Sequence, residues 1–129
     1  MDPLLDKLKF DSNGLIPVIV QDHANGEVLV VAYINREALE KTIATGKVHT
    51  YSRSRGRVAL KGESSRHFQH VKEIRTDCDR DALVIKVDQE GGACHEGYRS
   101  CFFRQYAPGA SDWKVVAERV FDPDAVYKK

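Results

Sequence analysis

The sequence lacks a long hydrophobic run. No apolar stretch among its 129 residues approaches the roughly 18 to 20 that a membrane-spanning helix needs. The start, Met1-Asp2-Pro3, also lacks the basic and apolar regions of a secretory signal peptide. We therefore expect a cytoplasmic protein with no membrane partner. Internal repeats, low-complexity tracts and linkers are missing too, so residues 1–129 are expected to form a single domain around one core.

Cysteine is scarce, with three in the whole chain. An odd number of thiols in a reducing compartment does not make a disulfide framework, so metal binding or catalysis is the better interpretation. The three thiols, Cys78, Cys94 and Cys101, all lie in one stretch of acidic residues and glycines. We expect the chemistry of the protein to be concentrated there.

The formal net charge is only +1, but the two signs are separated along the chain. Between Lys47 and Arg75, eight Lys or Arg residues stand against two Glu, whereas between Asp77 and Glu96 six acidic residues stand against two basic ones. Such an arrangement suits a phosphorylated ligand held at one end of a site and cations at the other. The alternative is that these charges are solvated surface.

The first half of the chain predicts a hairpin and a helix. Two β-branched runs, 15–20 and 28–34, are separated by Asn25-Gly26, which favours a tight hairpin turn. Asn35 is a suitable N-cap for a helix that continues to Thr45, and Gly46 is suited to end that helix in the left-handed conformation. The residues expected on its buried face are Ala38, Leu39, Thr42 and Ile43.

The other elements are predicted to be short. Strands are expected at 48–52, 70–76, 82–88 and 99–106, with a last strand or short helix at 113–121. A short amphipathic turn or helix is expected at 4–10 and a polar loop at 53–65. Many short strands with one clear helix predict an α+β fold with a mainly antiparallel β-sheet.

The polar loop carries the candidate substrate-binding residues. It alternates hydroxyl and guanidinium groups around glycines, and these groups bind phosphate oxygens well. An exposed basic loop without a ligand is the alternative. The candidates are Arg53, Arg55, Lys61, Glu63, Ser64 and Ser65.

The spacing of the three thiols differs from the paired C-x-x-C knuckles of structural zinc ribbons. Three thiolates leave one position on zinc for water, as in catalytic sites. His95 adjoins Cys94 and offers an alternative, because it is also able to complete a closed structural site.

Three carboxylates, Asp77, Asp79 and Asp81, surround the first thiol at every second position. In an extended segment they would lie on one face, with Cys78 on the other. Such an oxygen-rich cluster prefers Mg²⁺ and leaves the thiolates to Zn²⁺. A solvated turn is the alternative.

These motifs together resemble the phosphoribosyl-AMP cyclohydrolase family, whose members open the adenine ring of N1-(5-phosphoribosyl)-AMP in histidine biosynthesis. The similarity runs from about residue 14 to residue 104. Its most specific parts are Ser52-Arg53-Ser54, Lys61-Gly62-Glu63-Ser64-Ser65, Asp77-Cys78-Asp79-Arg80-Asp81, and Gly92-Ala93-Cys94-His95-Glu96-Gly97 followed by Ser100-Cys101-Phe102.

The resemblance implies a division of roles among these residues. Cys78, Cys94 and Cys101 would bind zinc, the three aspartates would bind magnesium, and His95 would transfer protons. A zinc-activated water would then attack C6 of the adenine and cleave the N1–C6 bond. The resemblance also implies an intertwined homodimer with its active sites at the interface.

Two positions depart from the family's usual pattern and concern the substrate pocket. Ala59 stands where members usually carry tryptophan, and Arg66 stands where they usually carry glycine. A paralogous zinc-dependent amidohydrolase acting on another purine-like nucleotide is therefore an alternative. A zinc-stabilised nucleic-acid-binding module is less favoured, because the basic stretch has few aromatic residues and the nearby carboxylates would repel a polyanion.

Overall fold

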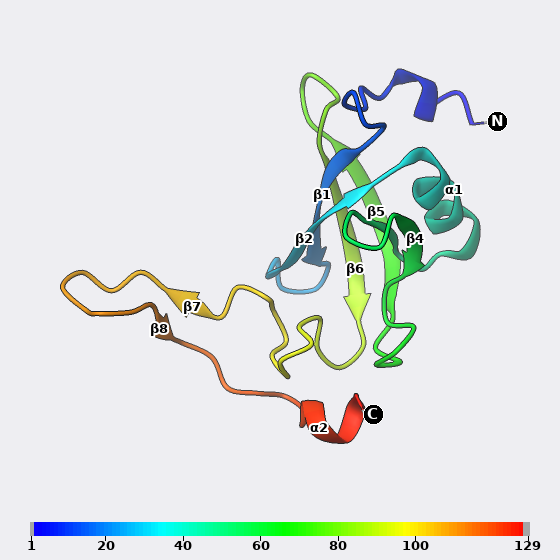
Figure 1. The fold of residues 1–129 in the computed structure, drawn as a ribbon. Coiled ribbons are helices and arrows are strands. Elements are labelled where there is room, and N and C mark those ends of the chain that lie inside the picture. Colours follow the sequence, from blue (N-terminus) through cyan, green and yellow to red (C-terminus); the bar gives the residue numbers. More distant parts are fainter. Residues whose placement is uncertain (1, 128–129) are drawn as a thin grey trace.

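The computed structural model describes residues 2–127 (Figure 1). Its centre is a four-stranded sheet with the spatial order β2-β1-β6-β5. The strands are β1 (Ile16–Asp22), β2 (Val28–Ile34), β5 (Gln69–Thr76) and β6 (Leu83–Gln89). Two pairs are antiparallel, β1 with β2 and β5 with β6, and the central pair of β1 with β6 is parallel. The α+β fold with mostly antiparallel strands is thus confirmed.

The β1–β2 hairpin forms where the sequence predicts it. Gly26 has a φ of +79°, which a residue without a side chain adopts readily. Asp22 organises the turn, because its carboxylate accepts hydrogen bonds from the backbone N–H groups of Ala24 (2.8 Å) and Asn25 (3.3 Å). The register of the hairpin shifts between Val20 and Gln21.

The helix α1 (Arg36–Thr45) has the predicted ends. The Asn35 side chain accepts a hydrogen bond from the backbone N–H of Ala38, and Gly46 ends the helix in the left-handed conformation. The predicted buried face is correct at three positions, Ala38, Leu39 and Thr42, and wrong at Ile43, which is 45% exposed.

The core lies between one face of the sheet and α1. Inward-facing side chains alternate along β1 and β6 with outward-facing ones, as a sheet with one covered face requires. A small antiparallel sheet is formed by β3 (His49–Ser52) and β4 (Arg57–Leu60). Val48, just before β3, belongs to the core, and Val58 of β4 packs against it. The expectation of an unstructured polar loop from 53 to 65 is wrong for β4, which pairs with β3 along its whole length.

The C-terminal part leaves the body as an extended arm (Figure 1). It contains only the two-residue strands β7 (Arg104–Gln105) and β8 (Lys114–Val115), followed by the short helix α2 (Pro123–Val126). The predicted strand at 99–106 is therefore wrong except for β7. At 113–121 the prediction holds only for β8, and β7 and β8 pair with each other and not with the central sheet. Large apolar side chains are exposed along this part: Phe102, Tyr106, Trp113, Val115, Val116 and Val120.

The N-terminal amphipathic segment is a single 3-10 turn, η1 (Leu5–Lys7), whose Leu5 is buried in the core. The longest helix of the described residues is α1, with 10 residues. No helix in residues 2–127 has the length and apolar character to cross a bilayer.

Candidate active site

The aspartate loop, residues 77–82, connects β5 to β6 and is a turn. The carboxylate of Asp77 accepts hydrogen bonds from the backbone N–H groups of Asp81 (3.0 Å) and Ala82 (3.3 Å), while Arg80 adopts a φ of +65°. The predicted extended segment is wrong here, because these bonds fold the chain back on itself.

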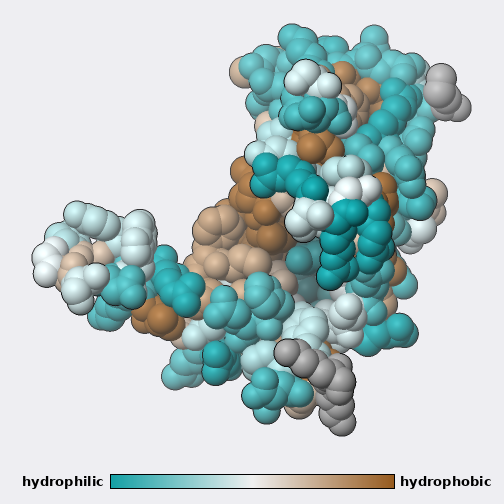
Figure 2. All heavy atoms as spheres, in the orientation of Figure 1, coloured by the Kyte–Doolittle hydropathy of each residue, from teal (hydrophilic) through white to brown (hydrophobic). Residues whose placement is uncertain are grey.

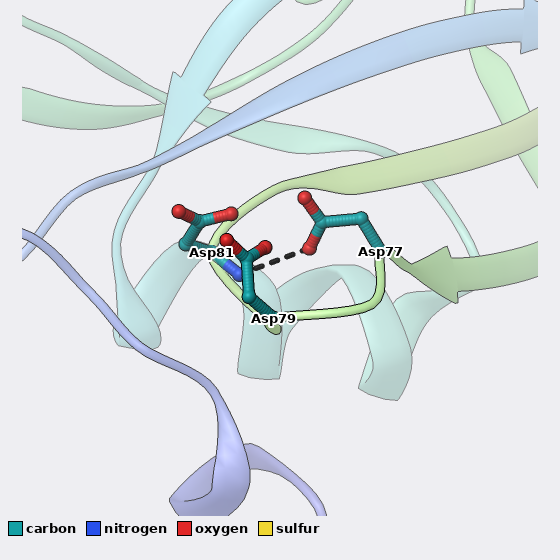
Figure 3. A group of neighbouring side chains, drawn as sticks. All are labelled: Asp77, Asp79 and Asp81. Carbon is teal, nitrogen blue, oxygen red and sulfur yellow. Dashed lines mark hydrogen bonds between the residues drawn. The ribbon is translucent and has the colours of Figure 1, made fainter.

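The turn nevertheless brings the three carboxylates together, as Figure 3 shows. One oxygen from each of Asp77, Asp79 and Asp81 lies within 4.8 Å of the other two, and all three residues are exposed. Hydrogen bonding to Asp79 and then to Asp77 raises the pKa of Asp81 to about 6. Three exposed carboxylates able to converge on one point are chemically suited to Mg²⁺.

The thiol loop, residues 91–101, follows β6. Cys94 is buried and Cys101 is partly buried. Burial raises the pKa of the Cys101 thiol to about 11, and the neighbouring Cys94 thiol adds to the effect, while the charge of Lys61 opposes it. Two soft donors are therefore adjacent in one partly enclosed place, and this donor set suits zinc.

Cys78 does not join the other two thiols within one chain. It lies in the aspartate loop at the start of β6, whereas the thiol loop begins after its end (Figure 1). The seven residues of β6 span about 23 Å at about 3.3 Å per residue. Among the described residues, the aspartates are the only group of three side chains close enough together to hold a metal ion.

His95, the predicted proton-transfer residue, is exposed and directly follows the buried Cys94. The loop turns sharply around it, because the backbone N–H groups of Glu96 and Gly97 bond to the sulfur and the carbonyl oxygen of Cys94 at 3.4 and 3.1 Å. His95 is thereby placed in a tight turn directly after the buried Cys94, with its side chain open to solvent.

A pocket of about 110 Å³ adjoins the thiol loop. Four of the six predicted substrate-binding residues line it, namely Lys61, Glu63, Ser64 and Ser65. Its other lining residues are Leu60, Gly62, His67, Gly92, Ala93 and Tyr127. Sequence reasoning missed His67 and Tyr127.

The remaining two candidates lie elsewhere. Arg53 places its guanidinium 4.1 Å from the centre of the Tyr33 ring, and Arg55 lies in the exposed turn between β3 and β4. Neither lines the pocket with Lys61. The structure therefore separates the predicted basic loop into a pocket side and a turn side.

The two departures from the family pattern occupy different backbone settings. Arg66 has a φ of +66°, a conformation that glycine adopts more easily, and its backbone N–H bonds to the Gly62 carbonyl at 2.7 Å. Ala59 lies in β4 opposite Thr50 and does not line the pocket. Neither substitution disrupts the loop from 61 to 65.

A larger cavity of about 510 Å³ lies between η1, α1 and the sheet, lined mainly by leucine and isoleucine. It reaches the aspartate loop only through Arg80 and holds none of the predicted site residues. The smaller pocket is the better candidate for the active site, because it adjoins the thiol loop and is lined by charged and hydroxyl groups.

Comparison with known proteins gives a consistent result. Residues 30–103 match the family model described as phosphoribosyl-AMP cyclohydrolase. A phosphoribosyl-AMP cyclohydrolase of Methanococcoides burtonii is 58% identical over 123 residues, which cover 95% of this chain and 98% of the relative. That of Methanosarcina mazei is 58% identical over 120 residues, or 93% and 95% of the two chains. The histidine biosynthesis bifunctional protein HisIE of Thermoanaerobacter pseudethanolicus is 50% identical over 128 residues, which cover 99% of this chain but 58% of the relative.

Proposed function

The chain belongs to the phosphoribosyl-AMP cyclohydrolase family, and from this premise we propose that it hydrolyses N1-(5-phosphoribosyl)-AMP in histidine biosynthesis. Water adds to C6 of the adenine ring and the N1–C6 bond breaks. C6 becomes a carboxamide carbon, and N1 remains in a formimino linkage to the phosphoribosyl group. No ammonia is released.

The observation that carries this proposal is the contact between the pocket and the thiol loop. Ala93 lines the pocket and immediately precedes Cys94, and the charge of Lys61 acts on the Cys101 thiol. A bound nucleotide with its phosphate near Lys61 would therefore place its ring close to the thiols. The proposed phosphate-binding pocket and the proposed site of ring opening would then be adjacent.

Zinc, when bound by thiolates, would supply a Lewis acid that lowers the pKa of a water molecule towards neutrality. His95 would accept a proton from that water, because this residue directly follows Cys94 in the chain and is exposed, and imidazole is the most common general base in proteins. The same imidazole would return the proton to the ring nitrogen as the N1–C6 bond breaks.

Magnesium would be held by Asp77, Asp79 and Asp81. Their convergence within one short turn supports this assignment. Exposed carboxylates of this kind bind Mg²⁺ together with water molecules and substrate phosphates. We expect a weaker, more readily exchanged ion there than at the thiols.

We further propose that the active protein is a homodimer in which Cys78 of one subunit joins Cys94 and Cys101 of the other. Cys78 is exposed at the far end of β6, so it is available to a neighbouring molecule. The outer face of the sheet also presents apolar side chains that one subunit does not cover, such as Ile19 (37% exposed) and the paired Val31 (48% exposed). Figure 2 shows hydrophobic residues along the body and near the base of the arm. A second copy would bury such surfaces.

The activity is tested by offering the purified protein, with zinc and magnesium, N1-(5-phosphoribosyl)-AMP and following the ultraviolet spectrum. We expect ring opening with this substrate and none with AMP or adenosine, whose N1 carries no substituent. Absence of ring opening would contradict the proposed function, and reaction with AMP or adenosine would favour the wider amidohydrolase alternative.

The shared zinc site is tested by complementation. Cys78→Ser and Cys94→Ser should each be inactive, but unfolding and refolding them together should restore about a quarter of the wild-type activity, because half of the dimers are mixed and each mixed dimer has one intact site. If all three thiols met within one chain, mixing would restore nothing.

A further inference from the structure

The C-terminal strap, residues 118–127, returns from the arm and lies against the thiol loop. The Val120 backbone N–H donates to the Gly97 carbonyl at 2.8 Å, and the Phe121 N–H donates to the same oxygen at 3.3 Å. The Arg119 side chain adds a third bond through its Nε, which donates to the Glu96 carbonyl at 2.8 Å. The strap is therefore attached through the backbone of the loop that carries Cys94 and His95.

The thiol loop has glycines where the strap makes its closest approach. A Cβ atom on Gly97 would lie 2.6 Å from the Phe121 carbonyl oxygen, and one on Gly92 would lie 2.8 Å from the Phe121 ring. No real Cβ tolerates such distances. The same ring packs edge-on against His67, with 4.7 Å between the ring centroids. Loop and strap are thus fitted to each other.

This attachment brings Tyr127 to the pocket. After Phe121, Asp122 caps α2 through its carboxylate, and the Tyr127 backbone N–H closes the helix on the Pro123 carbonyl at 2.8 Å. Tyr127 then lines the pocket together with residues of the loop from 61 to 65. Tyr127 is more than sixty positions from that loop in the chain, yet both line the same pocket.

The chemistry of the pocket suits a single phosphate group. Its volume of about 110 Å³ exceeds the space of one water molecule, roughly 30 Å³, but falls short of the roughly 300 Å³ at which sites for whole small molecules begin. Lys61 supplies an ammonium group, and Ser64 and Ser65 supply hydroxyl groups. The charge of Glu63 is offset by Arg57 at 3.3 Å.

We propose that Tyr127 is a substrate-binding residue whose phenolic hydroxyl donates a hydrogen bond to the phosphate group held by Lys61, Ser64 and Ser65. The strap holds this residue in place. The inference rests on the proposed function, which supplies a phosphorylated nucleotide, but it concerns a residue outside the matched segment 30–103.

The experiment compares wild-type protein with Tyr127→Phe, Tyr127→Ala and the control Asp124→Ser, which changes an exposed residue of the same helix that does not line the pocket. With N1-(5-phosphoribosyl)-AMP, Tyr127→Phe should raise KM roughly 10- to 100-fold, the usual effect of losing one hydrogen bond to a charged group, and change kcat little. Tyr127→Ala should raise KM at least as much, and Asp124→Ser should match the wild type. A wild-type KM in Tyr127→Phe would overturn the proposal even if Tyr127→Ala folds poorly.

A binding measurement separates this inference from the proposed function. Calorimetric titration with AMP should show weaker binding to Tyr127→Phe than to wild-type protein by a similar factor. If wild-type protein opened no ring, the proposed function would fall, while weaker AMP binding by Tyr127→Phe would still support the phosphate contact. Equal AMP affinity in the two proteins, or no AMP binding by the wild type, would overturn the contact itself.

Discussion

The two ends of strand β6 both carry side chains that we propose as metal ligands, but in opposite surroundings. At its start, the aspartate loop is exposed and its three carboxylates converge within one short turn. At its end, the thiol loop is largely buried, held to the C-terminal strap and to the edge of β2, where the Cys101 N–H donates to the Leu29 carbonyl at 2.7 Å.

The difference shows that the candidate oxygen ligands and the candidate sulfur ligands are related to the core in different ways. The oxygen ligands are complete within one chain and cost the fold little, because their loop contributes nothing to the core. The sulfur ligands are incomplete within one chain, and their loop does contribute to the core through Ala93. Substitutions in the aspartate loop that leave its backbone hydrogen bonds intact should therefore affect metal binding alone, whereas those that alter the buried part of the thiol loop should affect folding as well.

The largest effect is expected for His95→Ala. This variant tests whether one residue of the thiol loop acts in catalysis without contributing to folding. Because His95 is exposed, its loss should leave zinc content and melting temperature nearly unchanged. Turnover should fall by roughly 10² to 10⁴, the usual worth of a positioned acid or base. Zinc content is measured by metal analysis, melting temperature by calorimetry and turnover by kinetics, all on one preparation. Loss of zinc would instead make His95 a ligand, and wild-type turnover would exclude the proton-transfer role.

Gly97→Ala should show how a substitution in the thiol loop lowers the free energy of unfolding. Its φ is +99° and the new Cβ would meet the Phe121 carbonyl oxygen at 2.6 Å, so the strap must shift. We expect a loss of about 1 to 3 kcal/mol in unfolding free energy, measured by urea titration. Gly109→Ala is the matched control, because its φ of +83° is similar but no atom lies within 4 Å. Equal losses in the two variants would mean that backbone strain, and not the strap contact, sets the cost.

Asp79→Asn should affect metal binding only. Removing one of three charges should weaken Mg²⁺ binding by roughly tenfold or more, measured by calorimetric titration, with an unchanged melting temperature. Asp77→Asn provides the comparison within the same loop, since Asp77 also holds the turn through two backbone N–H groups. It should lower both Mg²⁺ affinity and melting temperature. A large loss of stability in Asp79→Asn would contradict the idea that this loop is independent of the core.

The smallest effects are expected at two arginines with positive φ. Arg80 in the aspartate loop has a φ of +65°, and Arg66 beside the pocket has a φ of +66°. Replacing either by glycine removes strain but adds freedom to the unfolded chain, so each should gain at most about 1 kcal/mol by urea unfolding. Arg55→Gly, in the exposed turn between β3 and β4, should give no gain. A clear loss of unfolding free energy in Arg66→Gly would show that the Arg66 side chain stabilises the fold by more than its backbone strain destabilises it.

The parts of the fold that could be predicted are those with local causes. The helix needed only Asn35 and Gly46 at its ends, and the hairpin needed Gly26 at its turn. The β4 strand was missed because it is short and lies between basic residues, and only its pairing with β3 reveals it. The thiols and aspartates were proposed as metal ligands from residue type, independently of shape, and their ligand roles stay predictions.

The parts that could not be predicted depend on tertiary contacts. The aspartate loop was expected to be extended, because alternation of Asp and other residues gives no sign that Arg80 will adopt a positive φ. Tyr127 was missed because nothing near it in the chain points to the pocket, which it reaches through the contact of Phe121 with Gly97. The glycines of the thiol loop were the one available signal in the sequence, since glycine permits another segment to pack closely against the backbone.

The parallel pairing of β1 with β6 has a consequence for how the chain folds during synthesis. These central strands, Ile16–Asp22 and Leu83–Gln89, come from distant parts of the chain, and contacts of that kind slow folding. The hairpin of β1 and β2 is complete once residue 34 exists, but the inner ladder requires residue 89. At about 5 to 20 residues per second of synthesis, the hairpin waits roughly 3 to 10 seconds with the buried side chains of Val18, Val20 and Leu29 uncovered. This interval is the period in which a newly made chain is most exposed to aggregation.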